Sequence, residues 1–126
     1  SVVDFAIRMI AKFNQFENIS ELLPLLEHSS EEVRRETIRS LCALEHFEII
    51  DTLISQFGEE TTLVKKTILD AIEHLGSYND LMMLKDKIQD DEWDLKIKYY
   101  GIAQRFLPEK KQSIYIQYEK EKALLL

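Results

Sequence analysis

The sequence is poor in the residues that break helices and crosslink chains. Its 126 residues include three glycines, two prolines and one cysteine. The lone Cys42 excludes an internal disulfide and mildly favours a reducing compartment. No apolar run is long enough to cross a bilayer, and no basic start followed by an apolar stretch marks a secretory signal. No long stretch alternates apolar and polar residues with period two, so these shortages favour an all-α protein.

Motifs for catalysis, metals and phosphates are also missing. The histidines, His28, His46 and His74, do not share the i, i+4 spacing of a zinc-binding helix. The acidic stretch from Asp90 to Asp94 lacks the glycine and the alternating ligands of a calcium loop. Glycine-rich phosphate loops and Gly-x-Ser-x-Gly elbows do not occur. We therefore predict a protein that is not an enzyme, with no catalytic, cofactor-binding or metal-ligating residues and no small-molecule substrate.

Positive charge is in deficit over the chain as a whole. The formal net charge is −7, from 16 basic and 23 acidic side chains. General affinity for nucleic acids depends on neutralising phosphates, so this balance disfavours a nucleic acid as the partner.

A sequence repeat with a period of 31 residues is the main positive signal. When the sequence is shifted by 31 residues, apolar positions fall on apolar positions without any insertion. The clearest columns are Val2, Val33, Val64, Leu95; Ile7, Ile38, Leu69, Tyr100; Ile10, Leu41, Ile72, Ala103; and Leu22, Leu53, Leu84. Within each copy these positions recur at steps of three and four, which predicts helices with one broad apolar face.

Two helices are predicted in each repeat. The longer B helices are expected at about 2–15, 31–45, 61–75 and 92–107, and the shorter A helices at about 19–28, 48–57 and 79–89. Pro24 should bend the first A helix or delay its start. Gly58 and Gly76 follow predicted helix ends, where a left-handed residue is expected. An aromatic column, Phe16, Phe47 and Tyr78, is expected to pack between the layers at the turns from B to A.

The openings of the B helices carry a family resemblance. Glu32-Val33-Arg34-Arg35 is followed by Thr37, Ser40 and Leu41, and Leu63-Val64-Lys65-Lys66 by Ile68, Ala71 and Ile72. This pattern resembles the acidic-x-Val-Arg-x-x-Ala-x-x-Ala-Leu signature of short bacterial HEAT-like repeats. The resemblance implies a right-handed α-α superhelix of antiparallel helix pairs, with the B helices lining a concave surface that binds other macromolecules. The copy with Trp93, Leu95, Tyr99 and Gly101 departs from the signature.

These patterns predict one solenoid domain over residues 1–126. It comprises the B helix of a partial repeat (1–16), repeats at about 17–46, 47–77 and 78–107, and a capping helix at 108–126. A basic amphipathic helix at 108–126 that touches a membrane is the less favoured alternative. Because the chain starts with Ser1, inside a repeat, we expect it to be a fragment of a longer protein.

The basic residues of the B helices suggest where a partner binds. These helices contain more basic than acidic residues. There are ten basic residues (Arg8, Lys12, Arg34, Arg35, Arg39, Lys65, Lys66, Lys96, Lys98, Arg105) and five acidic ones (Asp4, Glu36, Glu45, Asp70, Glu73). One interpretation is a relatively basic face for an acidic peptide or helix; the other is ordinary solvation of an exposed face. Within this set, the column Arg34, Lys65 and Lys96 is better explained as contacts between repeats than as a ladder for a partner.

Trp93 is the remaining candidate, because exposed tryptophans are enriched at binding hot spots. It would either anchor a ligand or cover a loop edge. The predicted partner-binding residues are therefore Arg35, Arg39, Lys66, Trp93 and Lys98.

The function predicted from these features is a non-catalytic protein-interaction scaffold, placed in the cytoplasm or in the soluble part of a membrane-tethered protein. One alternative is an enzyme or nucleic-acid-binding module of the HEAT-like kind, similar to DNA glycosylases or bilin lyases. Another alternative is an architectural spacer of a membrane-tethered protein.

Overall fold

The computed structural model describes Phe5, Arg8, Met9 and residues 19–106. Phe5, Arg8 and Met9 are helical, as expected for the first B helix. The rest of that helix, Phe16 and the capping helix predicted at 108–126 lie outside the described residues. In the described part of the chain every regular element is a helix, so the fold is an all-α solenoid.

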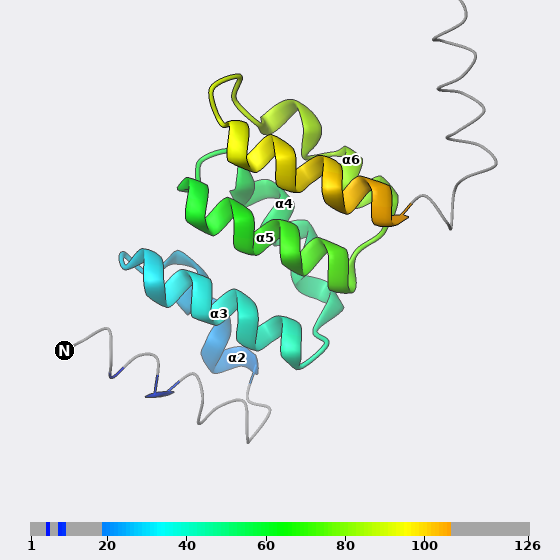
Figure 1. Cartoon of the computed structure of the whole chain (residues 1–126). Helices are drawn as coiled ribbons and strands as arrows, with labels where there is room; N and C mark the ends of the chain where they lie inside the picture. Colours follow the sequence, from blue (N-terminus) through cyan, green and yellow to red (C-terminus); the bar gives the residue numbers. More distant parts are fainter. Residues whose placement is uncertain (1–4, 6–7, 10–18, 107–126) are drawn as a thin grey trace, which may run out of the picture.

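Three long helices form one layer, called the B layer below. They are α3 (Glu31–Ala43), α5 (Thr62–Leu75) and a helix over residues 93–106. Figure 1 looks onto this layer and shows the three helices side by side in chain order. Their positions confirm the predicted B helices within two residues at each end, because the apolar columns and the caps fix them.

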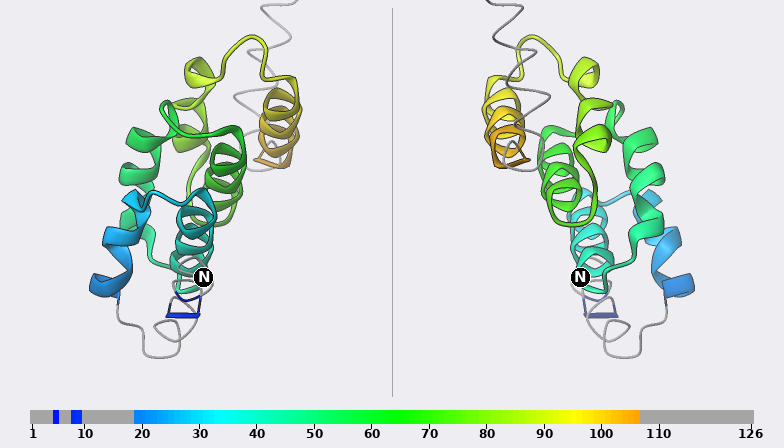
Figure 2. Two further views of the ribbon diagram at one scale, coloured as in Figure 1. Left: turned by 90° about the vertical axis from the view of Figure 1, so that its left-hand side faces the viewer. Right: turned by 90° about the vertical axis from the view of Figure 1, so that its right-hand side faces the viewer.

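Shorter segments form the second layer behind the first (Figure 2). They are α2 (Ile19–Leu22) with the 3-10 helix η1 (Leu23–Glu27), η2 (Phe47–Ile49) with α4 (Ile50–Phe57), and α6 (Tyr78–Met82) with η3 (Lys85–Lys87). Pro24 stands at the start of η1, where its missing N–H removes no helical hydrogen bond. The predicted A helices are therefore present, but each one combines an α-helical segment with a 3-10 segment.

The core lies between the two layers and follows the repeat columns. Val33, Val64 and Leu95 are fully buried, as are Leu22, Leu53 and Leu84 from the facing layer. Each such side chain stabilises the fold by about 1.5–3 kcal/mol when it leaves water. Because one helix pair cannot cover its own apolar face, stacking of successive pairs supplies most of this burial.

Equivalent hydroxyl side chains cap the B helices at the same repeat position. Ser30 Oγ accepts a hydrogen bond from the Val33 N–H at 3.4 Å, and Thr61 Oγ1 accepts one from the Val64 N–H at 3.3 Å. These caps satisfy N–H groups that the first helical turn leaves unpaired. The two caps therefore fix equivalent first residues for α3 and α5.

The turns from B to A differ from two expectations. Phe47 is 60% exposed and does not pack between layers, whereas Tyr78 is half-buried in an edge-to-face contact with Phe106, with ring centroids 6.3 Å apart. Gly58 and Gly76 have φ of −62° and −92°, so neither is left-handed. The left-handed residue is Glu45, with φ of 56°. Gly76 is required for space instead, since an added Cβ would lie 2.9 Å from the Ile72 carbonyl oxygen.

Candidate partner-binding surface

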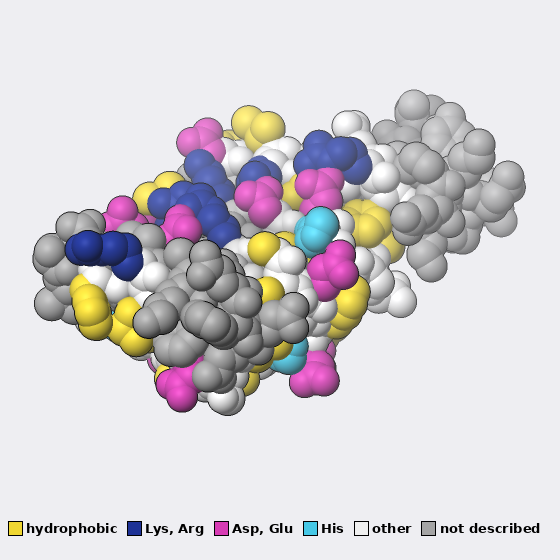
Figure 3. All heavy atoms as spheres, turned by 90° about the horizontal axis from the view of Figure 1, so that it is seen from below, with side chains coloured by type: hydrophobic (Ala, Val, Ile, Leu, Met, Phe, Trp, Pro, Cys, Tyr) yellow, Lys and Arg dark blue, Asp and Glu magenta, His cyan; other side chains and the backbone are white. Residues whose placement is uncertain are grey.

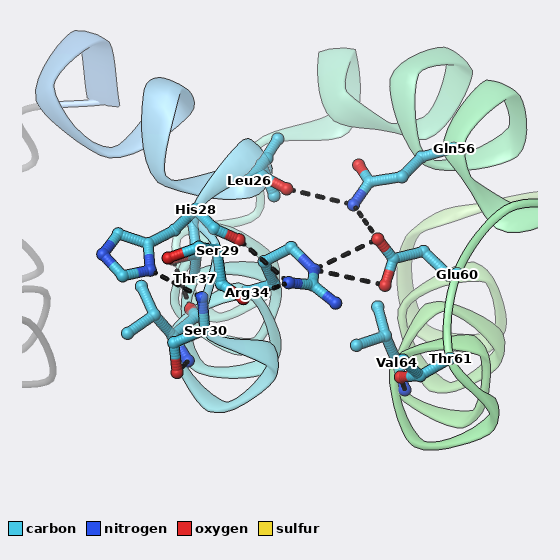
Figure 4. Close-up of polar contacts among 11 residues, drawn as sticks. Leu26, His28, Ser29, Ser30, Arg34, Thr37, Gln56, Glu60, Thr61 and Val64 are labelled. Carbon is cyan, nitrogen blue, oxygen red and sulfur yellow. Dashed lines mark hydrogen bonds and ion pairs between the residues drawn. The ribbon is translucent and has the colours of Figure 1, made fainter. Parts of the chain in front are cut away.

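A side-chain clasp joins the first two described repeats at their loop edge. Arg34 pairs with Glu60, with Nε 3.1 Å from Oε1, and donates through Nη1 to the carbonyl oxygens of His28 and Ser29 at 2.9 and 3.2 Å. Gln56 Nε2 donates to Glu60 Oε1 at 3.1 Å and to the Leu26 carbonyl oxygen at 3.0 Å. Figure 4 shows these groups converging between η1, α3 and α4. Nε and Nη1 of Arg34 are thereby both bound within the protein.

The next two repeats are joined by a related clasp. Lys65 Nζ lies 2.9 Å from Glu92 Oε1, and Lys65 is almost completely buried. Lys87, one repeat after Gln56, donates to the Ile54 carbonyl oxygen at 2.8 Å. Partial burial opposes ionisation of Glu92, but hydrogen bonds from the Gln89 N–H, Lys65 and Thr62 outweigh it and lower the pKa of this carboxyl.

The third member of the column contacts its own loop. Lys96 Nζ donates to the Asp90 carbonyl oxygen at 3.1 Å and lies 4.8 Å from the centre of the Trp93 ring. Arg34 and Lys65 thus make the predicted contacts between repeats, whereas Lys96 contacts the loop of its own repeat. All three cations therefore make contacts within the fold, and those of Arg34 and Lys65 are the more buried.

Three further cations of the B layer are also paired. Arg39 bonds to Glu36 at 2.5 Å, Lys98 Nζ lies 2.7 Å from Asp70 Oδ1, and Arg105 forms a two-point pair with Glu73. Figure 3 shows basic and acidic side chains interleaved where part of this layer is visible. The predicted excess of ten basic over five acidic residues therefore overstates the positive charge offered to a partner.

Arg35 and Lys66 differ from these paired cations. Arg35 Nε donates to Thr67 Oγ1 on α5 at 3.3 Å, a contact with a neutral group. Within residues 19–106, no carboxylate lies within ion-pair distance of Arg35 or Lys66. The two side chains occupy equivalent positions on α3 and α5, so they are neighbours across the B layer.

Large apolar side chains are exposed on the 93–106 helix. Trp93, Ile97 and Tyr100 are 67%, 70% and 54% exposed. Their spacing of four and three residues places them on one side of the helix. Trp93 is too exposed to act as a cover for the loop edge, so its exposure favours the anchor interpretation.

Comparison with known families settles the fold assignment. A family model described as HEAT repeats matches residues 5–98. The chain belongs to the HEAT-repeat family. No curated protein and no solved structure matched the chain. HEAT repeats commonly serve as protein-interaction scaffolds and are typically non-catalytic, and their stacked helices provide extended binding surfaces.

Reactive chemistry has little support in these HEAT repeats. Cys42 is half-buried; its burial and the nearby Asp70 both raise the pKa of the thiol, which keeps it protonated and a poor nucleophile. Among the described residues, no three His, Cys, Asp or Glu side chains converge as metal ligands. The described helices include none that is both long and apolar enough to cross a membrane.

Ile97 was not among the residues predicted from the sequence. It occupies the repeat position of Arg35 and Lys66, and this change from basic to apolar within one column was the available signal. Arg35 and Lys66 lie on the neighbouring helices α3 and α5, and Trp93 and Lys98 lie on the next helix of the layer. Arg39 and Lys98 lie on the same layer, each with a carboxylate partner.

Proposed function

We propose that the chain is a non-catalytic protein-interaction module whose B layer binds an acidic segment of another protein. The observation that carries this proposal is the pair Arg35 and Lys66, two neighbouring cations that no described carboxylate neutralises. Arg35 and Lys66 are half-buried, and Arg35 also contacts Thr67, but neither is held by a described carboxylate, so each can pair with a carboxylate of another protein without first breaking an ion pair in its own fold. The common scaffold role of HEAT repeats supports the same conclusion.

The five candidate residues then contribute unequally. Arg35 and Lys66 supply charge, and Trp93 supplies apolar area. Arg39 and Lys98 contribute less, because a partner carboxylate would have to compete with Glu36 and Asp70. The same pairing weakens the nucleic-acid alternative, since phosphate binding needs many available cations. The cytoplasmic location, the membrane-tethered spacer and the cap at 108–126 stay predictions.

The test is affinity capture with the full chain as bait, comparing charge reversals at different places. Arg35→Glu and Lys66→Glu should each weaken binding of the captured protein by about tenfold. Lys85→Glu on η3 makes the same change in net charge away from the B layer and should leave binding intact. Circular dichroism spectra should show unchanged helicity for all three variants. Equal binding by all variants, or equal loss in all three, would refute a binding site on the B layer.

A further inference from the structure

One row of equivalent repeat positions runs across the B layer, with one residue from each of its three helices. It consists of Arg35 on α3, Lys66 on α5 and Ile97 on the 93–106 helix, each 31 residues after the one before. The contact from Arg35 to Thr67 and the pair between Lys98 and Asp70 show that the helices meet along this level. The row therefore presents two cations and then an apolar side chain.

The apolar end of the row is confined to the last described helix. Ile97 is flanked by Trp93 one turn before it and by Tyr100 one turn after it, all three of them exposed. The positions equivalent to Trp93 are the polar residues Glu31 and Thr62. An exposed apolar cluster of this kind is typical of a place where a partner side chain is anchored.

Carboxylates border the row on both sides. Glu32 and Asp94 lie about one turn toward the helix starts, and Asp70 lies one turn after Lys66. An acidic segment displaced toward the helix starts would meet Glu32, and one displaced toward the helix ends would meet Asp70 together with Arg39, a cation already paired with Glu36. The basic part of the row is thus the one level at which such a segment meets cations on both α3 and α5.

The typical spacing of packed helices suits one extended conformation of the segment. Packed helices lie about 8–10 Å apart, so successive positions of the row are separated by about that distance. A polyproline II helix rises about 3.1 Å per residue with three residues per turn, so every third side chain recurs on one face about 9 Å further along. A β-strand would not match, because side chains three residues apart point to opposite faces.

We infer that the B layer binds a segment in polyproline II conformation that carries two acidic side chains three residues apart and, three residues further on, a large apolar side chain. The acidic groups pair with Arg35 and Lys66, and the apolar side chain packs on Ile97 beside Trp93. This inference rests on the proposed function and adds to it the conformation, spacing and order of the recognised residues.

Nuclear magnetic resonance titration of the full, 15N-labelled chain tests the inference, because it detects weak binding and locates it. The probe is a capped nonapeptide with glutamate at its first and fourth positions, leucine at its seventh and proline elsewhere. The control peptide has the same composition, with leucine fourth and the glutamates first and seventh. We expect the probe to shift the amides of Arg35, Lys66 and Ile97 and the indole of Trp93, and to bind about five- to tenfold more tightly than the control.

A double variant that exchanges two residues of the row should reverse the preference between the two peptides. Lys66→Ile combined with Ile97→Lys keeps the composition of the protein and changes only the order along the row. Both positions reach the surface, so the fold should persist, as dispersed amide signals would verify. The swap should make the protein prefer the control peptide over the probe. Unchanged preference would contradict the assigned order of the row.

The remaining outcomes separate this inference from the proposed function. If both peptides bind equally and Arg35→Glu weakens both, the B layer recognises acidity alone and the spacing inference is refuted. If neither peptide shifts any signal of the B layer at millimolar concentration, the inference is likewise refuted. In either case the capture experiment with Arg35→Glu and Lys85→Glu still decides whether the B layer binds an acidic partner.

Discussion

The two described junctions between repeats place a cation at the same repeat position of α3 and α5 but differ in their other polar contacts. At the first junction, between α3 and α5, the clasp is Arg34 with Glu60 and the far edge holds Cys42 and His74. At the second, between α5 and the 93–106 helix, the clasp is Lys65 with Glu92 and the far edge holds Glu73 paired with Arg105. Cys42 and His74 precede Glu73 and Arg105 by one repeat. The difference teaches that the apolar columns define the stack, whereas polar contacts are assembled separately at each junction.

Truncation of the shared apolar columns should have the largest effect. Ile38→Ala at the first junction and Leu69→Ala at the second remove fully buried side chains from one column. Each should lower the free energy of unfolding by about 2–5 kcal/mol. Chemical denaturation of the full chain measures both. A loss at one junction much smaller than at the other would break the claim that both depend equally on this column.

Removal of one clasp carboxylate should have the next largest effect. Glu92→Gln leaves Lys65 buried without its counter-ion and should cost about 1–3 kcal/mol. Glu60→Gln leaves Arg34 with two carbonyl acceptors and should cost less than Glu92→Gln. Denaturation at neutral pH compares the two, and a larger cost for Glu60→Gln would reverse the ranking of the clasps.

The second clasp also predicts a dependence on acid. The pKa of Glu92 is lower in the folded protein than its ordinary value of 4.5, so the unfolded chain binds this proton more readily. The resulting stability is fully present above that ordinary value and is lost as pH falls through the folded pKa. Unfolding followed from neutral pH into the acid range should therefore show a shallower loss for Glu92→Gln than for the native chain. Glu59→Gln, an exposed carboxylate of the neighbouring junction, is the control and should keep the native slope.

The turns that lead into the two junctions should respond in opposite directions. Glu45 and Gly76 occupy one repeat position, yet only Glu45 is left-handed. Glu45→Gly relieves this conformation and should stabilise the protein by about 0.5–1 kcal/mol. Gly76→Ala crowds the Ile72 carbonyl oxygen and should destabilise it by about 1–2 kcal/mol. Thermal unfolding gives the sign of each change in stability. If both substitutions changed the stability in the same direction, the difference between the two turns would be contradicted.

Loss of an exposed bridge should have the smallest effect. Lys98→Ala removes the pair with Asp70 at the second junction and should cost less than about 1 kcal/mol, and less still at high salt. Arg35→Ala, at the first junction, removes a contact with the neutral Thr67 and should cost a similar amount that salt does not change. Salt titration of the melting temperature distinguishes the two junctions. Equal salt dependence would show that the second junction gains nothing from the pair between Lys98 and Asp70.

Periodicity alone predicted the helices and the core. The column through Val33, Val64 and Leu95 is fully buried because each member faces the other layer at the same height. The structural role of Arg34 and Lys65 was also predictable, since a buried position with a basic residue requires a carboxylate from the adjacent loop. These features follow from the backbone repeat, which the sequence displays directly.

The candidate site was harder to predict, because it depends on which side chains find partners across helices. Lys98 and Asp70 are separated by most of a repeat, and their pairing depends on side-chain reach that no column records. Counting charges therefore ranked Arg39 and Lys98 with Arg35 and Lys66, although only the latter two lack a described ion-pair partner. Ile97 was missed because one apolar residue in a basic column resembles an ordinary substitution until its exposure is known.

The pair between Glu73 and Arg105 has a mechanical consequence. The second junction is fastened at both ends of its helices, by Lys65 with Glu92 and by Arg105 with Glu73. In the described part of the first junction, the clasp between Arg34 and Glu60 fastens one end of the helices. At their other end lies an open groove of about 330 Å³, lined in part by Cys42 and His74. We therefore expect the first junction to bend more readily than the second, with α3 pivoting about its clasped end while Arg35 moves relative to Lys66.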